Sequence, residues 1–240
     1  GYDLNLVSEG RFILGLGSQI KPHITKRFSM PWSKPAARMK EMIQAIQAIW
    51  ECWQNGTRLN FQGDFYTHTL MTPFFNPGPH PHGIGKIYAS AVGPLMTRAV
   101  AETADGLLVH PLNTTKYIKE VTLPVVEEGL ASAGKKRSDF DLSVNVMTAV
   151  GLTEESTQHA INATKQQIAF YASTPNYIAV LETHGVGDLH PELNRLSKQG
   201  KWQEMGLLID DDFLNTVAVV AETPEAAAKE IKARYGEYGD

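Results

Sequence analysis

Short apolar strands alternate with amphipathic helices along most of the 240-residue sequence, and this pattern constrains the fold more than any other feature. Strands are expected at residues 12–16, 86–91, 106–110, 141–150 and 216–220. Helices are expected at residues 35–53, 94–103, 115–134 and 226–235. Strands connected in this way form a parallel sheet covered by helices. The sequence therefore predicts an α/β fold.

The number of strand–helix units is smaller than a complete barrel requires. An eight-unit barrel takes about 250 residues, and only about five units are recognisable here. The rest of the length is taken by a proline-rich loop at about 55–85, with a short hairpin near 59–67, and by a helical insertion at about 156–213. No repeat or linker divides the sequence. We expect one partial barrel domain over residues 1–240.

Composition excludes several classes of function. The formal net charge is −4 and the charges are well mixed, so there is no basic stripe for nucleic acid and no polybasic membrane patch. Cys52 is the only cysteine, which excludes an internal disulfide and indicates a packing role in a reducing compartment. No apolar run approaches membrane-spanning length. We expect a cytoplasmic protein that acts on a small molecule.

The exit of the first strand carries two glycines, Gly15 and Gly17. Glycine lets the backbone approach a flat cofactor ring, because a side chain there would cover the ring. Simple turn geometry also explains them. As a dinucleotide fingerprint the pair is poor, since Ser18, Gln19 and Ile20 supply no third glycine. We interpret Gly15, Gly17 and Ser18 as candidate cofactor contacts.

The exit of the second strand is a candidate phosphate site. The helix after it begins at Pro94, and the free N–H groups and partial positive charge of a helix start favour anions. Ser90 could add a hydroxyl. A routine strand–helix turn is the alternative. The candidate contacts are Ser90, Ala91, Val92 and Gly93.

Other polar residues lie on loops at the same end of the predicted strands, where barrel active sites are built. His23 could donate a proton near neutral pH, or it is a surface loop histidine. Lys21 and Arg27 could pair with an acidic substrate, although solvated loop charges are common. His110 either lines the pocket or simply ends its strand beside Pro111.

Two clusters resemble metal ligands but lack a full set. His80 and His82 have the spacing of a metal pair, yet they lie in a proline-rich loop without a matching carboxylate and histidine. The run from Asp210 to Asp212 lacks the glycine and glutamate of an EF-hand, and we interpret it as a solvated turn. No metal site is expected. Asp105 is interpreted as part of a structural turn.

A series of motifs resembles the luciferase-like monooxygenase superfamily in order and spacing, over nearly the whole chain. The motifs are the segment 10–17, the helix 38–50 with Glu41, Gly63-Asp64-Phe65-Tyr66, the segment 87–94, Ala104-Asp105-Gly106 and Thr223-Pro224-Glu225. The runs 17–23 and 27–32 are similar to a branch of deazaflavin-dependent oxidoreductases. Each motif alone is weak, and their order carries the resemblance.

The resemblance implies a (β/α)8 TIM barrel of the bacterial-luciferase type that is incomplete at the N-terminus, because residues 12–16 would be its fourth strand. Either the sequence is a fragment, or another segment or chain closes the gap. The resemblance also implies that the loop from Ser90 binds the phosphate of coenzyme F420, with FMN as the alternative. In some deazaflavin enzymes of the superfamily a glutamate proton donor follows this strand; the corresponding residue here is Ile20, which leaves His23 as the candidate acid.

The implied activity is that of an oxidoreductase: hydride transfer with F420, or FMN-dependent monooxygenation, of a small organic substrate. Gln19, Arg27 and His110 would line the substrate pocket. A homo-oligomer is expected. Two alternatives stay open, namely a non-catalytic flavin-binding or assembly protein, and a metal-dependent barrel hydrolase that rests on His80 and His82.

Overall fold

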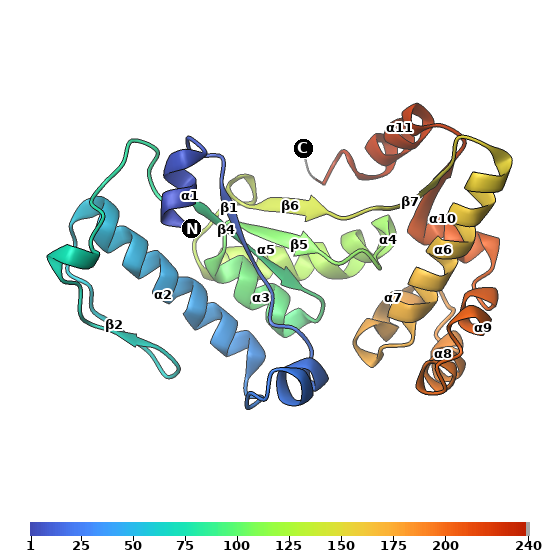
Figure 1. Cartoon of the computed structure of the whole chain (residues 1–240), viewed down its shortest axis with the longest axis horizontal. Helices are drawn as coiled ribbons and strands as arrows, with labels where there is room; N and C mark the ends of the chain where they lie inside the picture. Colours follow the sequence, from blue (N-terminus) through green and yellow to red (C-terminus); the bar gives the residue numbers. More distant parts are fainter. Residues whose placement is uncertain (239–240) are drawn as a thin grey trace. The chain divides into compact units, whose positions relative to one another are not determined.

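The computed structural model describes residues 1–238 (Figure 1). The chain divides into two compact units. The first comprises Gly1–Leu108 with Val125–Asp141, and the second comprises Val109–Pro124 with the chain from Leu142 onward. Within the described residues the longer strands form two parallel sheets and not a closed barrel. The fold is α/β, as the alternating pattern predicts.

The first unit holds most of the elements at the beginning of the chain. Its helices are α1 (Tyr2–Val7), α2 (Pro35–Asn55), α3 (Pro94–Thr103) and most of α5 (Leu123–Ser132). Its strands are β1 (Ile13–Leu16), β2 (Phe61–Gln62), β3 (Thr67–His68), β4 (Lys86–Ala91) and most of β5 (Gly106–Val109). Shorter helical turns are His23–Arg27, Pro73–Phe75 and Arg137–Asp139. The expected hairpin in the long loop is confirmed, because β2 and β3 pair antiparallel.

A four-stranded sheet has the order β1-β4-β5-β6, where β6 is Asp141–Val144. β1 and β4 are parallel, with Ile13 opposite Lys86 and Leu16 opposite Ala89. The first strand is apolar in sequence but is not fully buried. β1 is an edge strand, so Ile13 is 44% exposed, whereas Ile87 and Ala89 of the inner strand β4 are fully buried.

Helix α2 packs beside α3, as Figure 1 shows. It begins at Pro35, a favoured first helical residue because its missing N–H costs nothing there. Its N-cap residue is Lys34, whose side chain makes no capping hydrogen bond. Lys34 has a left-handed backbone conformation (φ 36°), and the Ser33 hydroxyl accepts a hydrogen bond from Arg38 Nη2 (2.9 Å).

Helix α5 approaches α3 closely at Gly129. A Cβ at this position would lie 2.7 Å from Ala101 Cβ and 3.0 Å from the carbonyl oxygen of Arg98. Both distances are shorter than van der Waals contact, and the second involves backbone that cannot rotate away. Glycine is therefore required where these two helices cross.

The long loop is attached to α2 and α1 by specific contacts. Glu41 of α2 accepts backbone hydrogen bonds from Asp64 (3.0 Å), Phe65 (2.6 Å) and Tyr66 (2.6 Å). Desolvation raises the pKa of Glu41, but these donors and Arg38 outweigh it and hold the pKa below its usual value. The motif of Glu41 with Gly63-Asp64-Phe65-Tyr66 is thus one structural unit.

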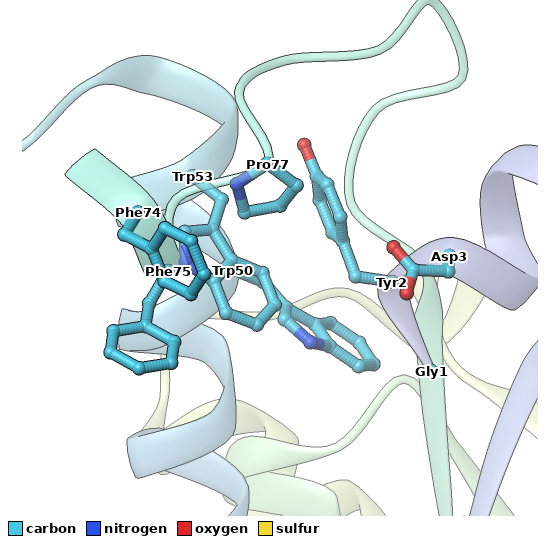
Figure 2. A pocket seen from close by; sticks show the side chains of 8 residues that line it. All are labelled: Gly1, Tyr2, Asp3, Trp50, Trp53, Phe74, Phe75 and Pro77. Carbon is cyan, nitrogen blue, oxygen red and sulfur yellow. The ribbon is translucent and has the colours of Figure 1, made fainter. Parts of the chain in front are cut away.

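Aromatic side chains hold the far part of the loop. Figure 2 shows Tyr2 and Pro77 beside the two tryptophans of α2 at a pocket of about 320 Å³. The rings of Tyr2 and Trp53 meet edge to face, with centroids 5.2 Å apart. The Tyr2 hydroxyl lies 2.7 Å from Gln54 Oε1 and 3.0 Å from the carbonyl oxygen of Gly78. Helix α1 and the loop are therefore fixed to the same end of α2.

The second unit is mainly helical. Its helices are α4 (Thr115–Tyr117), α6 (Glu154–Ala172), α7 (Ile178–Thr183), α8 (Leu189–Lys198), α9 (Trp202–Leu207), α10 (Asp211–Val217) and α11 (Pro224–Tyr235). A π-helical turn, Ile118–Thr122, continues α4 into α5, and a 3₁₀ turn, Pro175–Tyr177, precedes α7. Thr223 is the N-cap of α11, since its Oγ1 accepts a hydrogen bond from the N–H of Ala226 (3.1 Å).

The strand expected over residues 141–150 is two strands. β6 belongs to the four-stranded sheet, whereas β7 (Met147–Val150) pairs in parallel with β8 (Ala218–Ala221). The break falls at Asn145, whose side-chain amide donates to the carbonyl oxygen of Val109 (3.0 Å). Its own carbonyl oxygen accepts from Asn113 Nδ2 (3.3 Å). At Asn145, these side-chain hydrogen bonds replace the backbone hydrogen bonds that a continuous strand would make.

The core of the second unit lies between α6 and the helices around it. Fully or almost fully buried members include Ile168, Leu181, Leu193, Met205 and Leu214. Each such side chain contributes roughly 1.5–3 kcal/mol of transfer free energy. At the start of α10, Asp210 Oδ1 accepts from the N–H of Phe213 (2.7 Å). The aspartate run interpreted as a solvated turn therefore contains a helix cap.

The Gly129 contact generates a stability prediction. We expect Gly129→Ala to lower the free energy of unfolding by about 1–3 kcal/mol, because the new methyl group overpacks the α3–α5 contact. Glu127→Ala, at an exposed position of the same helix, should change it by less than about 0.5 kcal/mol. Urea denaturation measures both. Equal stability of the two variants would show that α3 and α5 do not meet at this glycine.

The Glu41 contacts generate a local prediction. Replacing the carboxylate in Glu41→Gln leaves one acceptor oxygen for three N–H groups. Amide hydrogen exchange at Asp64, Phe65 and Tyr66 should become roughly tenfold faster. Glu51→Gln, on the exposed side of the same helix, serves as the control. Unchanged exchange in Glu41→Gln would mean that this carboxylate does not hold the turn.

Candidate functional site

The exits of β1 and β4 lie next to each other in the first unit. A Cβ added to Gly17 would come within 2.8 Å of Ser90 Oγ. Any side chain at Gly17 would therefore displace the Ser90 hydroxyl. Gly15 differs, because a Cβ there would make only an ordinary contact with Leu108 Cδ1 (3.6 Å). Gly17 and Ser90 were predicted separately from the sequence, and the structure brings them together.

The turn from β4 into α3 presents an uncapped helix start. Gly93 is the N-cap, with extended backbone (φ −89°, ψ 160°), and it has no side chain to accept the first amide groups. An added Cβ on Gly93 would meet nothing within 4 Å. The carbonyl oxygen of Gly93 accepts from the N–H of Thr97 (3.0 Å), which fixes the first turn. Of the other two predicted contacts in this turn, Ala91 is buried and Val92 is half-buried.

The loop after β1 has an unusual backbone. Gln19 (φ 55°), Ser29 (φ 54°) and Lys34 (φ 36°) are left-handed, a conformation that is uncommon for residues other than glycine. Such residues concentrate where the surrounding structure holds a functional segment in place. The Ser18 hydroxyl donates to the carbonyl oxygen of Gln19 (3.2 Å). Gly17 and Ser18 border a pocket of about 230 Å³ between this loop and the start of α2.

His23 and Arg27 occupy the π-helical turn of the same loop. His23 is half-buried, and Arg27 is exposed with its guanidinium carbon 5.5 Å from the centroid of the Phe28 ring. Neither residue lines the 230 Å³ pocket. The structure therefore places His23 and Arg27 on the loop after β1 without joining either to Gly17 or Ser90.

His110 lies in the second unit, at the end of β5, in an aromatic cluster. Its ring stacks on Tyr177 at 4.2 Å and meets Tyr171 edge to face at 4.6 Å. Burial lowers the pKa of His110 to about 4. The N–H of Leu112 donates to its Nδ1 (3.1 Å), which leaves Nε2 to carry the proton of the neutral ring. His110 is thus a neutral hydrogen-bond donor at physiological pH.

The residues that surround His110 in the structure were not predicted from the sequence. Asn113 is 3% exposed, its Nδ2 donates to the carbonyl oxygen of His110 (2.6 Å), and its Oδ1 has no hydrogen-bond partner among residues 1–238. Tyr171 comes from α6 and Tyr177 from the turn before α7. Those two tyrosines belong to the predicted helical insertion, where periodicity indicates only packing. Asn113 is a polar residue that closely follows a predicted strand, and this was the one sequence signal for a site near His110.

The sequence also drew attention to His80, His82 and Cys52, and the structure shows what surrounds them. His80 is buried, and the centroid of its ring lies 4.4 Å from that of Tyr2 and 5.9 Å from that of His82. Within residues 1–238 no group of three or more His, Cys, Asp or Glu side chains is arranged to hold a metal ion. Cys52 is buried in α2, as expected. Over the same residues no helix is both long and apolar enough to cross a membrane.

Comparison with known proteins identifies relatives over almost the entire chain. An uncharacterized protein of Mycobacterium tuberculosis is 54% identical over 92% of this chain. The 5,10-methylenetetrahydromethanopterin reductase of Archaeoglobus fulgidus is 28% identical over 95% of it. The chain spans 65% of the length of each of these two relatives.

A solved structure has the same fold. The coenzyme F420 dependent tetrahydromethanopterin reductase of Methanopyrus kandleri superimposes with a TM-score of 0.72 at 22% identity, covering 96% of this chain and 67% of that one. The family model described as luciferase-like monooxygenase matches residues 2–240. The resemblance inferred from the motifs is confirmed, and the chain belongs to the luciferase-like monooxygenase family.

Proposed function

We propose that the chain forms part of an oxidoreductase that uses coenzyme F420 to transfer a hydride to or from a small organic substrate. The observation that carries the proposal is that Gly17 lies close to Ser90, beside the uncapped start of α3. The cofactor named for the reductase of Methanopyrus kandleri, and the 28% identity to the Archaeoglobus fulgidus reductase, support the choice of F420.

The residues at this junction suit a cofactor that carries both a phosphate and a flat ring. Ser90 offers a hydroxyl, and the first turn of α3 offers backbone N–H groups with the positive end of the helix dipole. Gly17 leaves room for a ring that a side chain would exclude. We assign the phosphate to the loop Ser90–Gly93 and ring contact to Gly15, Gly17 and Ser18.

When bound, F420 would supply a ring carbon that accepts or donates a hydride. The chain's own part is to orient that ring and to exclude water. His23, on the loop after β1, is proposed to hold or move the substrate proton, because no carboxylate follows β1 where Ile20 stands. Gln19 and Arg27 are proposed to contact the substrate from the same loop.

In the second unit, His110 is proposed to donate a hydrogen bond through Nε2 to a bound group. Its neutral state suits this role, because an imidazole that stays uncharged can enter a desolvated complex without the cost of burying a charge. FMN-dependent monooxygenation is the alternative reaction of the same site. A non-catalytic cofactor-binding protein is the second alternative. The metal-dependent hydrolase has no matching ligand set among residues 1–238.

A negative charge at Ser90 tests the proposal that the loop Ser90–Gly93 binds the cofactor phosphate. We expect Ser90→Asp to weaken F420 binding by at least about tenfold, since the carboxylate repels the phosphate and competes for the same N–H groups. Ser138→Asp, at an exposed position of the first unit, should leave the affinity unchanged. Quenching of F420 fluorescence measures both. Equal affinity of the two variants would place the phosphate elsewhere.

The state of His110 is tested by titration. NMR of the imidazole should give a midpoint near 4, and Tyr177→Ala should raise it toward about 6.5 because the stacked ring is lost. Since the folded pKa is below the unfolded one, the stability from neutral His110 is present above about pH 6.5 and is lost as the pH falls toward 4. A midpoint near 6.5 in the unmodified chain would contradict the neutral donor.

A further inference from the structure

We infer that the pocket beside Gly17 binds an uncharged, carbon-rich group of the substrate, about the size of one ring. The inference rests on the proposed function, because it makes this pocket the substrate side of the same cofactor site. The pocket has a volume of about 230 Å³ and includes Gly17 and Ser18 in its wall. A group held there would therefore lie against the strand exit assigned to the cofactor ring.

The wall of the pocket is apolar. Ile24, Pro31 and Trp32 come from the loop after β1, and Met39 and Met42 come from the first turns of α2. Over the described part of the chain, residues 1–238, no acidic or lysine side chain lines it. Methionine is flexible and polarisable, so two methionines can adapt to different apolar shapes.

Among residues 1–238, Arg38 is the single charged side chain that lines the pocket, and its guanidinium has neighbours within the first unit. Its Nη2 donates to Ser33 Oγ (2.9 Å), and its guanidinium carbon lies 4.5 Å from the centroid of the Phe65 ring. It also faces Glu41 closely enough to lower the pKa of that carboxyl. The nearby carboxylate of Glu41 offsets part of the positive charge that Arg38 would present to a phosphate or carboxylate in the pocket. An anionic substrate group is therefore disfavoured.

The size of the pocket sets the size of the group. A dry apolar cavity of roughly 150 Å³ is enough to bind benzene. A pocket of about 230 Å³ therefore holds one six-membered ring or a short branched chain with little space left. Gln19, Ser29 and Lys34, in the loop that forms one wall, have left-handed backbone conformations of the kind that persist where the surrounding structure holds them.

The experiment uses the whole chain with methyl-¹³C methionine and follows the methyl signals by NMR. Cyclohexanol should shift the signals of Met39 and Met42 saturably and leave that of Met147, in the second unit, unmoved. Cyclohexanecarboxylate, which has the same ring with a charge, should bind at least about tenfold more weakly. Equal binding of the two probes, or no shift of Met39 and Met42, would overturn the inference.

A pair of variants locates the binding. Met42→Phe fills the pocket and should weaken cyclohexanol binding at least about tenfold, as read from the Met39 signal. Ile46→Phe, one turn further along α2 and outside the pocket, should have no effect. If Met42→Phe binds normally, the inference fails while F420 binding is untouched. If instead cyclohexanol binds as expected but Ser90→Asp leaves F420 affinity unchanged, the cofactor proposal fails and the apolar pocket stands.

Discussion

The parallel pairing of β1 with β4 is the constraint on which the candidate site depends. Because Leu16, the last residue of β1, lies opposite Ala89, the next residues along the two chains are Gly17 and Ser90, and a Cβ on Gly17 would lie 2.8 Å from Ser90 Oγ. A slip of one residue would turn Ser90 to the other face of the sheet and separate it from Gly17. The position of α3 follows from the same pairing, since its N-cap Gly93 comes directly after β4. Strand register therefore links the proposed ring contact to the proposed phosphate contact.

The two described units contribute different chemistry. In the first unit, an uncapped helix start and a serine hydroxyl suit an anion, and an apolar pocket next to Gly17 suits an uncharged group. In the second unit, burial between two tyrosines keeps His110 neutral, which suits the uncharged hydrogen-bond donor that we propose. A fold of this kind supports many reactions, and membership of the luciferase-like monooxygenase family does not by itself select one. The proposed activity depends on the residues at these places.

Elements whose signals are local could be predicted from the sequence. β4 and α3 begin and end at the expected residues because an apolar run and a proline mark them, and α11 follows from Thr223 and Pro224. The division between β6 and β7 could not be predicted, because it depends on hydrogen bonds from Asn145 to Val109 and from Asn113 to Asn145. The contacts of Gly17 and of His110 likewise join residues that are distant in sequence. Local pattern identifies such residues as candidates, and only the tertiary structure shows which of them meet.

We propose that the exits of β1 and β4 hold the cofactor. Backbone amide chemical shifts of the ¹⁵N-labelled chain during titration with F420 test it most directly, because they report the place of binding residue by residue. If these exits hold the cofactor, the saturable shifts should be concentrated at Gly17, Ser90, Gly93 and the first turn of α3. Binding that shifts amides elsewhere while these residues stay unchanged would contradict it, as would the absence of any saturable shift.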